Sequence, residues 1–447
     1  MKIGIAKETR PGEKRVAASA ETVKKFIQLG FEVQVESGAG VSASITDKML
    51  EGAGAKIVKT AKDALGDVDI ALKVRKPTED EIKLMKKGTV LVCLMEPFKD
   101  RALIDAIAAQ GLTTFALEFV PRITRAQSMD VLSSQSNLAG YRAVLDAAYE
   151  FGRAFPMMMT AAGTIPPARA LVMGAGVAGL QAIATARRLG AIVSATDVRP
   201  AAKEQVESLG ATFVAVEDEE FKAAETSGGY AKEMSAEYKK KQAELIAETI
   251  KKQDMVITTA LIPGRPAPVL VTEDMVKTMK PGSVIVDLAV EQGGNCPLSE
   301  PGKVVVKHGV TIIGHLDMAS RIADDASLLY AKNLLNFVTP MVDKESKTLK
   351  INEEDEIIAA SMITKDGKIT DERVEALKVD GTGKDGAGKT ASTEEKKPAA
   401  KKAAPKKPAA KKSTAKASAD KAPASKASAS KADDSVSAAP ASDKTSS

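Results

Sequence analysis

The chain contains 447 residues, of which 3% are aromatic and none is tryptophan. Its apolar content is therefore mostly aliphatic, which is typical of an α/β protein with buried parallel strands and argues against a surface that stacks aromatic side chains on bases. The formal net charge of +5 divides unevenly, because residues 384–447 hold 15 lysines and 7 acidic residues, a net of +8, which leaves −3 for the rest.

The first third of the sequence alternates short apolar runs with helical patterns, as a doubly wound sheet requires. Helices are predicted over residues 19–29, 47–51 and 100–110, and strands over residues 2–6, 31–36, 56–58, 70–74, 90–94 and 113–116. The first strand is not followed by a G-x-G-x-x-G sequence. This half is therefore Rossmann-like without a predicted phosphate site.

A second domain follows a stretch with few helix breakers, residues 137–155, which predicts a long connecting helix. An apolar run leads into the sequence G-A-G-V-A-G at residues 174–179. A helical pattern, a second apolar run over residues 191–196 and then Asp197 complete a unit of strand, turn, helix and strand. This context predicts a Rossmann dinucleotide site rather than the alternative, an ordinary glycine turn.

Each part of this motif has a physical role in holding a dinucleotide. Gly174 permits the tight turn, Gly176 lets the backbone approach a pyrophosphate, and Gly179 lets the helix pack closely on its strand. The helix N-terminus offers N–H groups to the phosphates. Asp197, 21 residues beyond Gly176, would accept from the ribose hydroxyls and repel a 2′-phosphate. We expect NAD(H) to be preferred to NADP(H), although the neighbouring Arg199 could pair a 2′-phosphate.

Further apolar runs complete the second sheet. They predict strands over residues 213–216, 255–259, 284–288 and 310–313. The loops at residues 261–264 and 291–294 are pocket candidates, because ligands of open α/β sheets bind at the carboxyl ends of strands.

A return segment ends the folded part of the chain, with a helix predicted over residues 324–336 and strands over residues 357–364 and 368–370. We expect it to rejoin the first domain. The predicted parts are a first Rossmann-like domain of residues 1–136 and 317–374, an NAD(H)-binding Rossmann domain of residues 137–316, and a tail of residues 375–447. The fold class is α/β, with two doubly wound parallel sheets, two crossing helices and a cleft between the lobes.

The tail is expected to be disordered. Lysines recur every five residues from Lys396 to Lys431 among alanine, proline and serine. A five-residue step turns about 140° beyond a full revolution of an α-helix, so no helix face collects them. One interpretation is weak, salt-sensitive attachment to anionic lipid or nucleic acid. The favoured alternative is a spacer without a dedicated partner, because aromatic and arginine residues are missing from it.

Two cysteines, Cys93 and Cys296, and two histidines, His308 and His315, lack the spacing of a disulfide framework or a metal site. We expect reduced, buried thiols, structural histidines and no metal. No apolar run of 18 residues and no signal-peptide pattern is found, so a soluble chain is expected.

Long, specific motifs occur along residues 1 to about 370, the first being P-R-I-T-R-A-Q-S-M-D at residues 121–130. The others lie at residues 133–142, 160–163, 174–179, 228–232, 258–264 and 293–297. Together they resemble the NAD(H)-binding component, domain I of the alpha subunit, of proton-translocating NAD(P) transhydrogenase. The resemblance excludes the tail.

The resemblance implies that Arg122, Gln127 and Asp130 position the nicotinamide without a general acid or base, with Ser133 assisting. It also implies that Tyr230 belongs to a mobile loop that closes over bound nucleotide. The predicted cofactor-binding residues are Arg122, Gln127, Ser133, Gly174, Gly176, Val177, Gly179, Asp197, Val198, Arg199, Gly229, Tyr230 and Leu261. From the residues alone, the alternatives are surface loops, with Arg122 and Asp130 in an exposed ion pair.

Basic residues at 7–15 and 73–77 also resemble alanine dehydrogenase, in which such residues hold a substrate carboxylate. Oxidising an amine needs an acid or base, commonly histidine, as well as hydride transfer. This chain has Met95, Glu96 and Pro97 where that relative would present its histidine. Hydride exchange between two nicotinamides moves no proton at the reacting carbons, so a site without histidine suits it.

The predicted function is that of a Re/Si-specific transhydrogenase component that binds NADH and passes hydride to NADP+, which is held only on a partner subunit. The resemblance implies activity only with NADP(H)-binding and membrane-spanning subunits, a homodimer, and a cytoplasmic location at the inner face of the plasma membrane through those partners. The alternatives are an NAD-dependent alanine or related amino-acid dehydrogenase, and a non-enzymatic NAD(H)-binding protein tethered by its basic tail.

Overall fold

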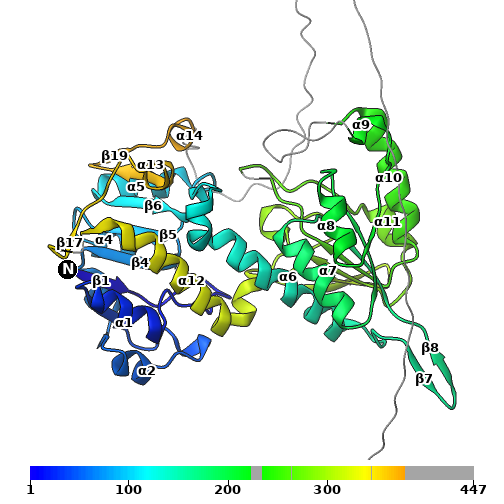
Figure 1. Ribbon diagram of the computed structural model, residues 1–447, viewed down its shortest axis with the longest axis horizontal. Coiled ribbons are helices and arrows are strands. Elements are labelled where there is room, and N and C mark those ends of the chain that lie inside the picture. Colours follow the sequence, from blue (N-terminus) through cyan, green and yellow to red (C-terminus); the bar gives the residue numbers. More distant parts are fainter. Residues whose placement is uncertain (223–233, 263, 344, 378–447) are drawn as a thin grey trace, which may run out of the picture. The chain divides into compact units, whose positions relative to one another are not determined.

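Two separate β-sheets with helices around them organise the protein (Figure 1). The structure, a computed structural model, describes residues 1–222, 234–262, 264–343 and 345–377. Within these residues one sheet has eight strands and the other seven, and most neighbouring strands are parallel. The α/β class with two doubly wound sheets is therefore confirmed.

The first sheet has the strand order of a Rossmann fold. Its parallel strands are β1 (Lys2–Ile5), β2 (Glu32–Glu36), β3 (Lys56–Val58), β4 (Ile70–Arg75), β5 (Val90–Leu94) and β6 (Thr113–Ala116). They lie in the order β3-β2-β1-β4-β5-β6, so the order reverses between β1 and β4. Two antiparallel strands, β18 (Met362–Lys365) and β19 (Lys368–Ile369), extend the sheet beyond β6. The late segment of the chain thus returns to the first sheet.

The second sheet repeats this order. Its parallel strands are β9 (Arg169–Met173), β10 (Ile192–Thr196), β11 (Thr212–Phe213), β12 (Met255–Thr258), β13 (Val284–Asp287) and β15 (Val310–Ile313). Their order is β11-β10-β9-β12-β13-β15, and antiparallel β14 (Val304–Lys307) closes the edge. The order reverses between β9 and β12, which is where α/β folds bind their ligands.

Helices surround both sheets. Those of the first are α1 (Ala20–Gln28), α2 (Asp47–Gly52), α3 (Ala61–Leu65), α4 (Glu79–Leu84), α5 (Arg101–Ala109), α13 (Glu356–Ser361) and α14 (Glu372–Glu375). Those of the second are α7 (Val177–Arg188), α8 (Ala202–Ser208), α9 (Glu219–Lys222), α10 (Ala236–Ile250) and α11 (Glu273–Thr278). Two hairpins pair β7 (Met158–Thr160) with β8 (Gly163–Ile165), and β16 (Val342–Asp343) with β17 (Thr348–Leu349). None of the described helices is long and apolar enough to cross a bilayer.

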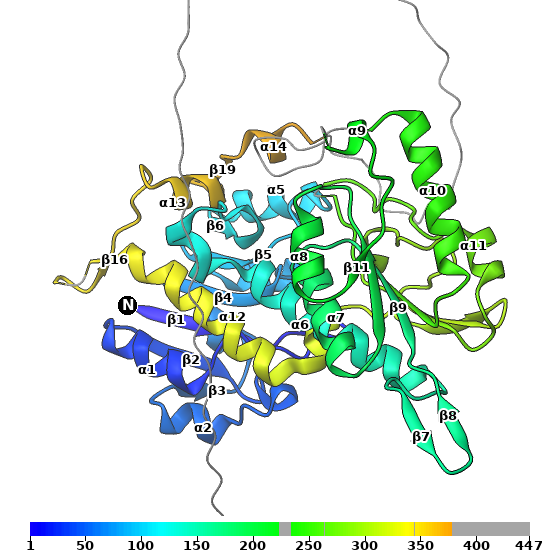
Figure 2. The same cartoon turned by 45° about the vertical axis from the view of Figure 1, so that its right-hand side comes forward.

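Two longer helices, α6 (Val131–Glu150) and α12 (Ala323–Val338), connect the parts of the chain that form the two sheets, and they lie side by side (Figure 2). The Ser134 hydroxyl donates to the Asn333 side-chain oxygen at 2.7 Å, and the Gln135 amide donates to the Ala326 carbonyl at 3.1 Å. These bonds fix one helix against the other.

Two predicted elements were wrong, and local capping explains both. The helix predicted over residues 137–155 begins at Val131, because the Asp130 carboxylate caps it by accepting from the Ser133 amide at 2.9 Å, and it ends at Glu150. The strand predicted over residues 357–364 is helical as far as Ser361. There the Asp355 carboxylate accepts from the Ile357 amide at 2.8 Å and starts α13.

Three predictions stay predictions. They are the domain boundaries at residues 136, 316 and 374, the cleft between the lobes, and the disordered tail. Of the tail, only residues 375–377 belong to the described part of the chain.

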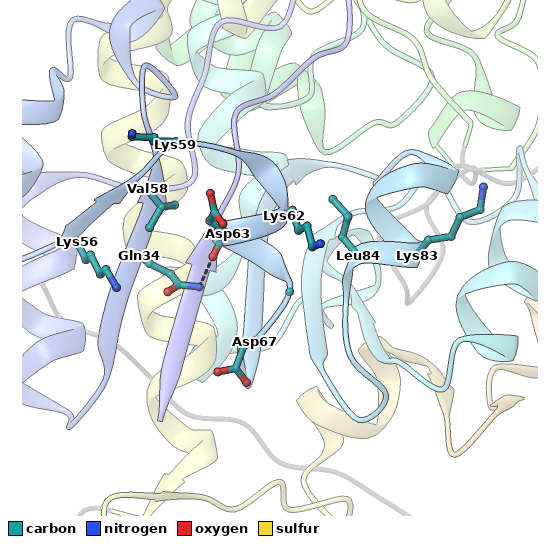
Figure 3. Close-up of a pocket in the computed structure, with 10 residues that line it drawn as sticks. Gln34, Lys56, Val58, Lys59, Lys62, Asp63, Asp67, Lys83 and Leu84 are labelled. Atoms are coloured by element: carbon teal, nitrogen blue, oxygen red, sulfur yellow. Dashed lines mark hydrogen bonds between the residues drawn. The ribbon is translucent and has the colours of Figure 1, made fainter.

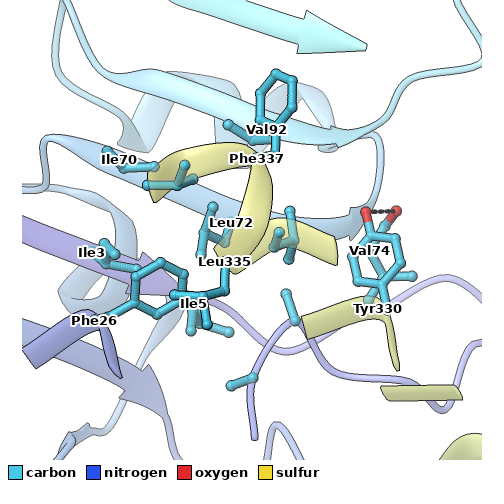
Figure 4. Close-up of a cluster of buried hydrophobic side chains, with 14 of the residues drawn as sticks. Ile3, Ile5, Phe26, Ile70, Leu72, Val74, Val92, Tyr330, Leu335 and Phe337 are labelled. Carbon is cyan, nitrogen blue, oxygen red and sulfur yellow. Dashed lines mark hydrogen bonds between the residues drawn. The ribbon is translucent and has the colours of Figure 1, made fainter. Parts of the chain in front are cut away.

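Tyr330 of α12 is the largest of the fully buried side chains. It belongs to an aliphatic and aromatic core on β1, β4 and β5, together with Phe26 and Phe337 (Figure 4). Its hydroxyl donates to the carbonyls of Lys73 at 2.9 Å and Val74 at 3.2 Å. The hydroxyl therefore ties α12 to the middle of the first sheet.

Tyr330→Phe should lower the free energy of unfolding by about 1 to 2 kcal/mol, because the ring still fills the core while buried carbonyl groups lose their donor. Chemical denaturation of the purified chain measures this. Tyr149→Phe is the matched control, because Tyr149 is 87% exposed and its substitution should change nothing. Equal stability of the two variants would contradict the assigned role of the hydroxyl.

Candidate functional site

The predicted glycine turn lies where β9, β10 and β12 end, at the reversal of strand order in the second sheet. The Gly174 amide donates to the Thr196 carbonyl at 2.8 Å. The Thr259 hydroxyl donates to the Gly174 carbonyl at 3.0 Å. The turn after β9 is thus held by the ends of both neighbouring strands.

The three glycines of the motif differ in what surrounds them. Gly174 has a φ of +104°, and a Cβ there would lie 2.5 Å from the Thr259 hydroxyl. A Cβ on Gly179 would lie 1.8 Å from the Gly174 carbonyl oxygen. Gly176 has an ordinary φ of −76°, and no atom lies within 4 Å of where its Cβ would be. The first and third glycines are required by packing, whereas Gly176 faces open space.

That open space lies before the N-terminus of α7. Gly176 is the N-cap residue of α7, so no side chain caps the helix, whereas Ser19 and Thr46 cap α1 and α2. A helix N-terminus with uncapped N–H groups and partial positive charge attracts an anion. The arrangement fits a pyrophosphate.

Asp197, at the end of β10, is already engaged within the protein. Its carboxylate accepts from the Ala175 amide at 2.7 Å and from the Arg199 amide and Nε, both at 2.9 Å. This hydrogen bonding raises the pKa of Arg199 further. The carboxylate therefore holds the glycine turn and the arginine together, and a ribose hydroxyl would share it with them.

Apolar side chains border the turn. Val177, Val198 and Leu261 follow β9, β10 and β12 in turn and are exposed by 41%, 61% and 46%. Ile262, which the sequence analysis did not single out, is also exposed. Exposed aliphatic groups beside an anion site suit the flat face of an adenine ring.

The predicted nicotinamide loop lies just before α6. Arg122 and Gln127 are exposed, while Ser133 donates its hydroxyl to the Asp130 carboxylate at 2.5 Å. Arg122 forms no ion pair with Asp130, so the alternative of an exposed ion pair is wrong. None of the hydrogen bonds between described residues joins this loop to the glycine turn.

Helix α6 nevertheless links the two segments mechanically. A Cβ on Gly140 would lie 2.0 Å from the Ala178 carbonyl oxygen, so α6 packs directly on the first turn of α7. The loop thus precedes a helix that rests on the N-terminal turn of α7.

The sequence analysis missed a buried hub that holds the loops after β12 and β13. The fully buried Asp287 carboxylate accepts from the amides of Ala289, Asn295 and Cys296 at 3.0 to 3.1 Å. The Asn295 side chain in turn binds the amide and carbonyl of Ala260, at 3.1 and 2.9 Å. The signal available in the sequence was an aspartate at the end of an apolar run, followed by two glycines.

Some predicted residues lie outside the described part of the chain. They are Gly229 and Tyr230, with the rest of residues 228–232, and residue 263 of the loop at 261–264. The two cysteines are buried and free, and the described residues contain no group of three or more side chains arranged to hold a metal.

A surface hollow of about 670 Å³ lies on the first sheet (Figure 3). Residues of β2, β3, α3 and α4 line it, among them Lys56, Lys62 and Asp63. It includes none of the predicted site residues.

Comparisons with known proteins agree with the fold. The models for the alanine dehydrogenase/PNT N-terminal and C-terminal domains match residues 4–139 and 143–372. The first of the polypeptides that make up NAD(P) transhydrogenase subunit alpha in Rhodospirillum rubrum is 63% identical over 374 residues, which is 83% of this chain and 97% of that protein. The crystal structure of transhydrogenase from Sinorhizobium meliloti is 58% identical with a TM-score of 0.76, covering 83% of this chain and 100% of that one. An L-alanine dehydrogenase structure is more distant, at 26% identity and a TM-score of 0.71, covering 84% and 98%.

The glycine turn gives a paired stability prediction. Gly179→Ala should lower the unfolding free energy by roughly 1 to 3 kcal/mol, because its Cβ must push against the backbone of Gly174. Gly176→Ala should leave stability unchanged, since its conformation and surroundings accept a methyl group. Thermal unfolding followed by circular dichroism compares them. Equal losses in both variants would contradict the open space at Gly176.

Proposed function

The chain belongs to the alanine dehydrogenase/PNT family and, within it, to the NAD(P) transhydrogenase alpha subunits, and from this premise we propose that it binds NADH at the glycine turn and passes hydride to NADP+ on a partner subunit. The observation that carries the proposal is the uncapped N-terminus of α7 behind the open face of Gly176. It lies at the reversal of strand order, the usual ligand position of such a sheet.

Residues of the second sheet would hold the adenosine diphosphate half. The backbone at Gly174, Gly176 and Gly179 and the first amides of α7 would bind the pyrophosphate. Asp197, already aligned by the Ala175 amide, would accept from the ribose. The exposed side chains beside the turn, Val177, Val198 and Leu261, would contact the adenine.

The reacting half is assigned to the loop before α6. Arg122, Gln127, Asp130 and Ser133 offer donors and acceptors for a carboxamide and a ribose, and the close contact of α6 with α7 supports this assignment. Gly229 and Tyr230 are proposed to cover the bound nucleotide. Bound NADH supplies the hydride from C4 of its ring, so these side chains need only orient it and transfer no proton.

The finer parts of the proposal concern the assembly. We propose Re/Si-specific transfer, NADP(H) held only on a partner subunit, and proton movement in membrane-spanning subunits that keep this chain at the inner face of the plasma membrane. A homodimer is proposed as well. For the tail the proposal is a spacer role, with binding to anionic lipid or nucleic acid as the alternative.

Reconstitution tests the function directly. The purified chain should transfer hydride from NADH to an NADP+ analogue too slowly to measure alone, and rapidly once the NADP(H)-binding subunit is added, because the acceptor has no site on this chain. Absorbance of the reduced analogue reports the rate. Rapid transfer by the chain alone, or reduction of NAD+ by alanine or another amino acid, would overturn the proposal.

Asp197→Ala tests the nucleotide preference. It should weaken NADH binding and strengthen NADPH binding, each by roughly ten-fold, because it removes a charged acceptor and releases Arg199 for the 2′-phosphate. Fluorescence titration with each nucleotide measures both. In the double variant Asp197→Ala/Arg199→Ala the gain for NADPH should disappear. A gain that survives in the double variant, or no gain in the single one, would refute the specificity assigned to this pair.

A further inference from the structure

A cluster of alternating charges follows the strands where the order of the first sheet reverses. Its cations are Arg10, Arg15, Arg75 and Lys99, and its carboxylates are Glu13, Glu96, Glu291 and Asp317. They come from segments after β1, β4 and β5 of the first sheet and after β13 and β15 of the second. The reversal between β1 and β4 is a ligand-binding position in this class of sheet, yet no glycine turn is found there.

Asp317 lies at the centre of the guanidinium groups. It is 4% exposed, and its carboxylate contacts Arg75 and lies 3.8 Å from Arg15 and 3.9 Å from Arg10. Neither carboxylate oxygen accepts a hydrogen bond from a described residue. The backbone of Asp317 has a φ of +48°, in the left-handed region that disfavours side chains. Both features oppose stability, so we looked for a role beyond packing.

Glu13 binds the same arginines as a carboxylate ligand would. Its fully buried side chain accepts from Nε and a terminal nitrogen of Arg15 at 2.8 and 2.6 Å, and from Nε of Arg75 at 3.3 Å. This two-point contact is the geometry in which arginine recognises carboxylates. Burial opposes ionisation, but Arg15 and Arg75 outweigh it and lower the pKa of Glu13 to about 2. Glu13 is therefore charged at neutral pH.

The remaining contacts balance the charge. Glu96 pairs with Lys99 at 2.7 Å and with Arg10 at 3.3 Å. Glu291 lies 3.3 Å from Arg10 and 3.8 Å from Arg75. Every cation in the cluster thus faces an internal carboxylate, and no excess positive charge is left for an incoming anion.

We propose that Asp317 and Glu13 are internal occupants of an arginine-lined carboxylate site, and that they set reaction specificity by denying that site to small monocarboxylates such as 2-oxo acids and amino acids. This inference rests on the proposed function, because excluding a small substrate leaves hydride from NADH to the acceptor on the partner subunit. The site would take a small carboxylate once an internal one is removed.

The experiment uses the full chain and sodium pyruvate as the probe, with binding measured by calorimetry. Wild-type chain should show no saturable binding. Asp317→Gly, which removes the carboxylate and suits a positive φ, should bind pyruvate at least about ten-fold more tightly. Asp317→Asn should gain less, because the amide still fills the space. Adding Arg75→Met to Asp317→Gly should abolish the gain.

Asp146→Asn is the matched control. Asp146 is also buried, and it pairs with Arg142 and Arg321, both at 2.8 Å, at a place without the other carboxylates. Its substitution releases two arginines just as the test variant does. A similar gain of pyruvate binding in Asp146→Asn would mean that any released arginine suffices, and it would overturn the proposal.

Two further measurements make every outcome decisive. Circular dichroism shows whether Asp317→Gly folds, and a folded variant that gains no pyruvate binding refutes the inference. If that variant does not fold, Asp317→Asn and the wild-type chain decide, since saturable binding of pyruvate by the wild type also refutes it. NADH titration is separate: a wild-type chain that does not bind NADH defeats the proposed function, whereas the pyruvate results still stand by themselves.

Discussion

The candidate site depends on the close approach of helix α7 to the backbone around it. Gly179 brings α7 against the Gly174 carbonyl, and Gly140 of α6 brings a second helix against the Ala178 carbonyl. Neither contact leaves room for a Cβ atom. The N-terminus of α7 is therefore fixed by main-chain contacts on two sides, and its direction does not depend on side-chain rotamers. An anion site made of amides and a helix dipole needs this rigidity, because its attraction falls off within the first turn.

Polar side chains with buried oxygen atoms hold the loops around that helix. Asp197 bridges the glycine turn and Arg199, while Asp287 and Asn295 fix the loops after β12 and β13. Each carboxylate accepts several N–H groups, so loops that would otherwise have many conformations keep one. The edge of the second sheet is thus prepared before any ligand arrives, which lowers the entropy cost of binding.

The sequence predicted those parts of the fold that local patterns determine. Strands β3, β5, β6 and β15 fall on the predicted residues, because buried parallel strands are continuous apolar runs bounded by turns. The start of α6 and the helix α13 were missed, since a single capping aspartate decided each. For the site, the motif predicted the glycine geometry. It did not predict the Asp197–Arg199 pair in detail, the exposed Ile262, or the cluster around Asp317, which joins residues as far apart as 10 and 317. Long-range pairing of charges leaves no periodic trace in a single sequence.

The return of the chain to its first sheet has a consequence for the order of folding. The second sheet uses only residues 169–313, whereas the first needs α12 for its core and residues 362–369 for its edge. During synthesis, the later sheet can therefore be completed at the ribosome while the earlier one still exposes the unpaired edge of β6. Until the last strands emerge, that edge can pair with other chains, so the portion of the molecule made first is the last to be protected from aggregation.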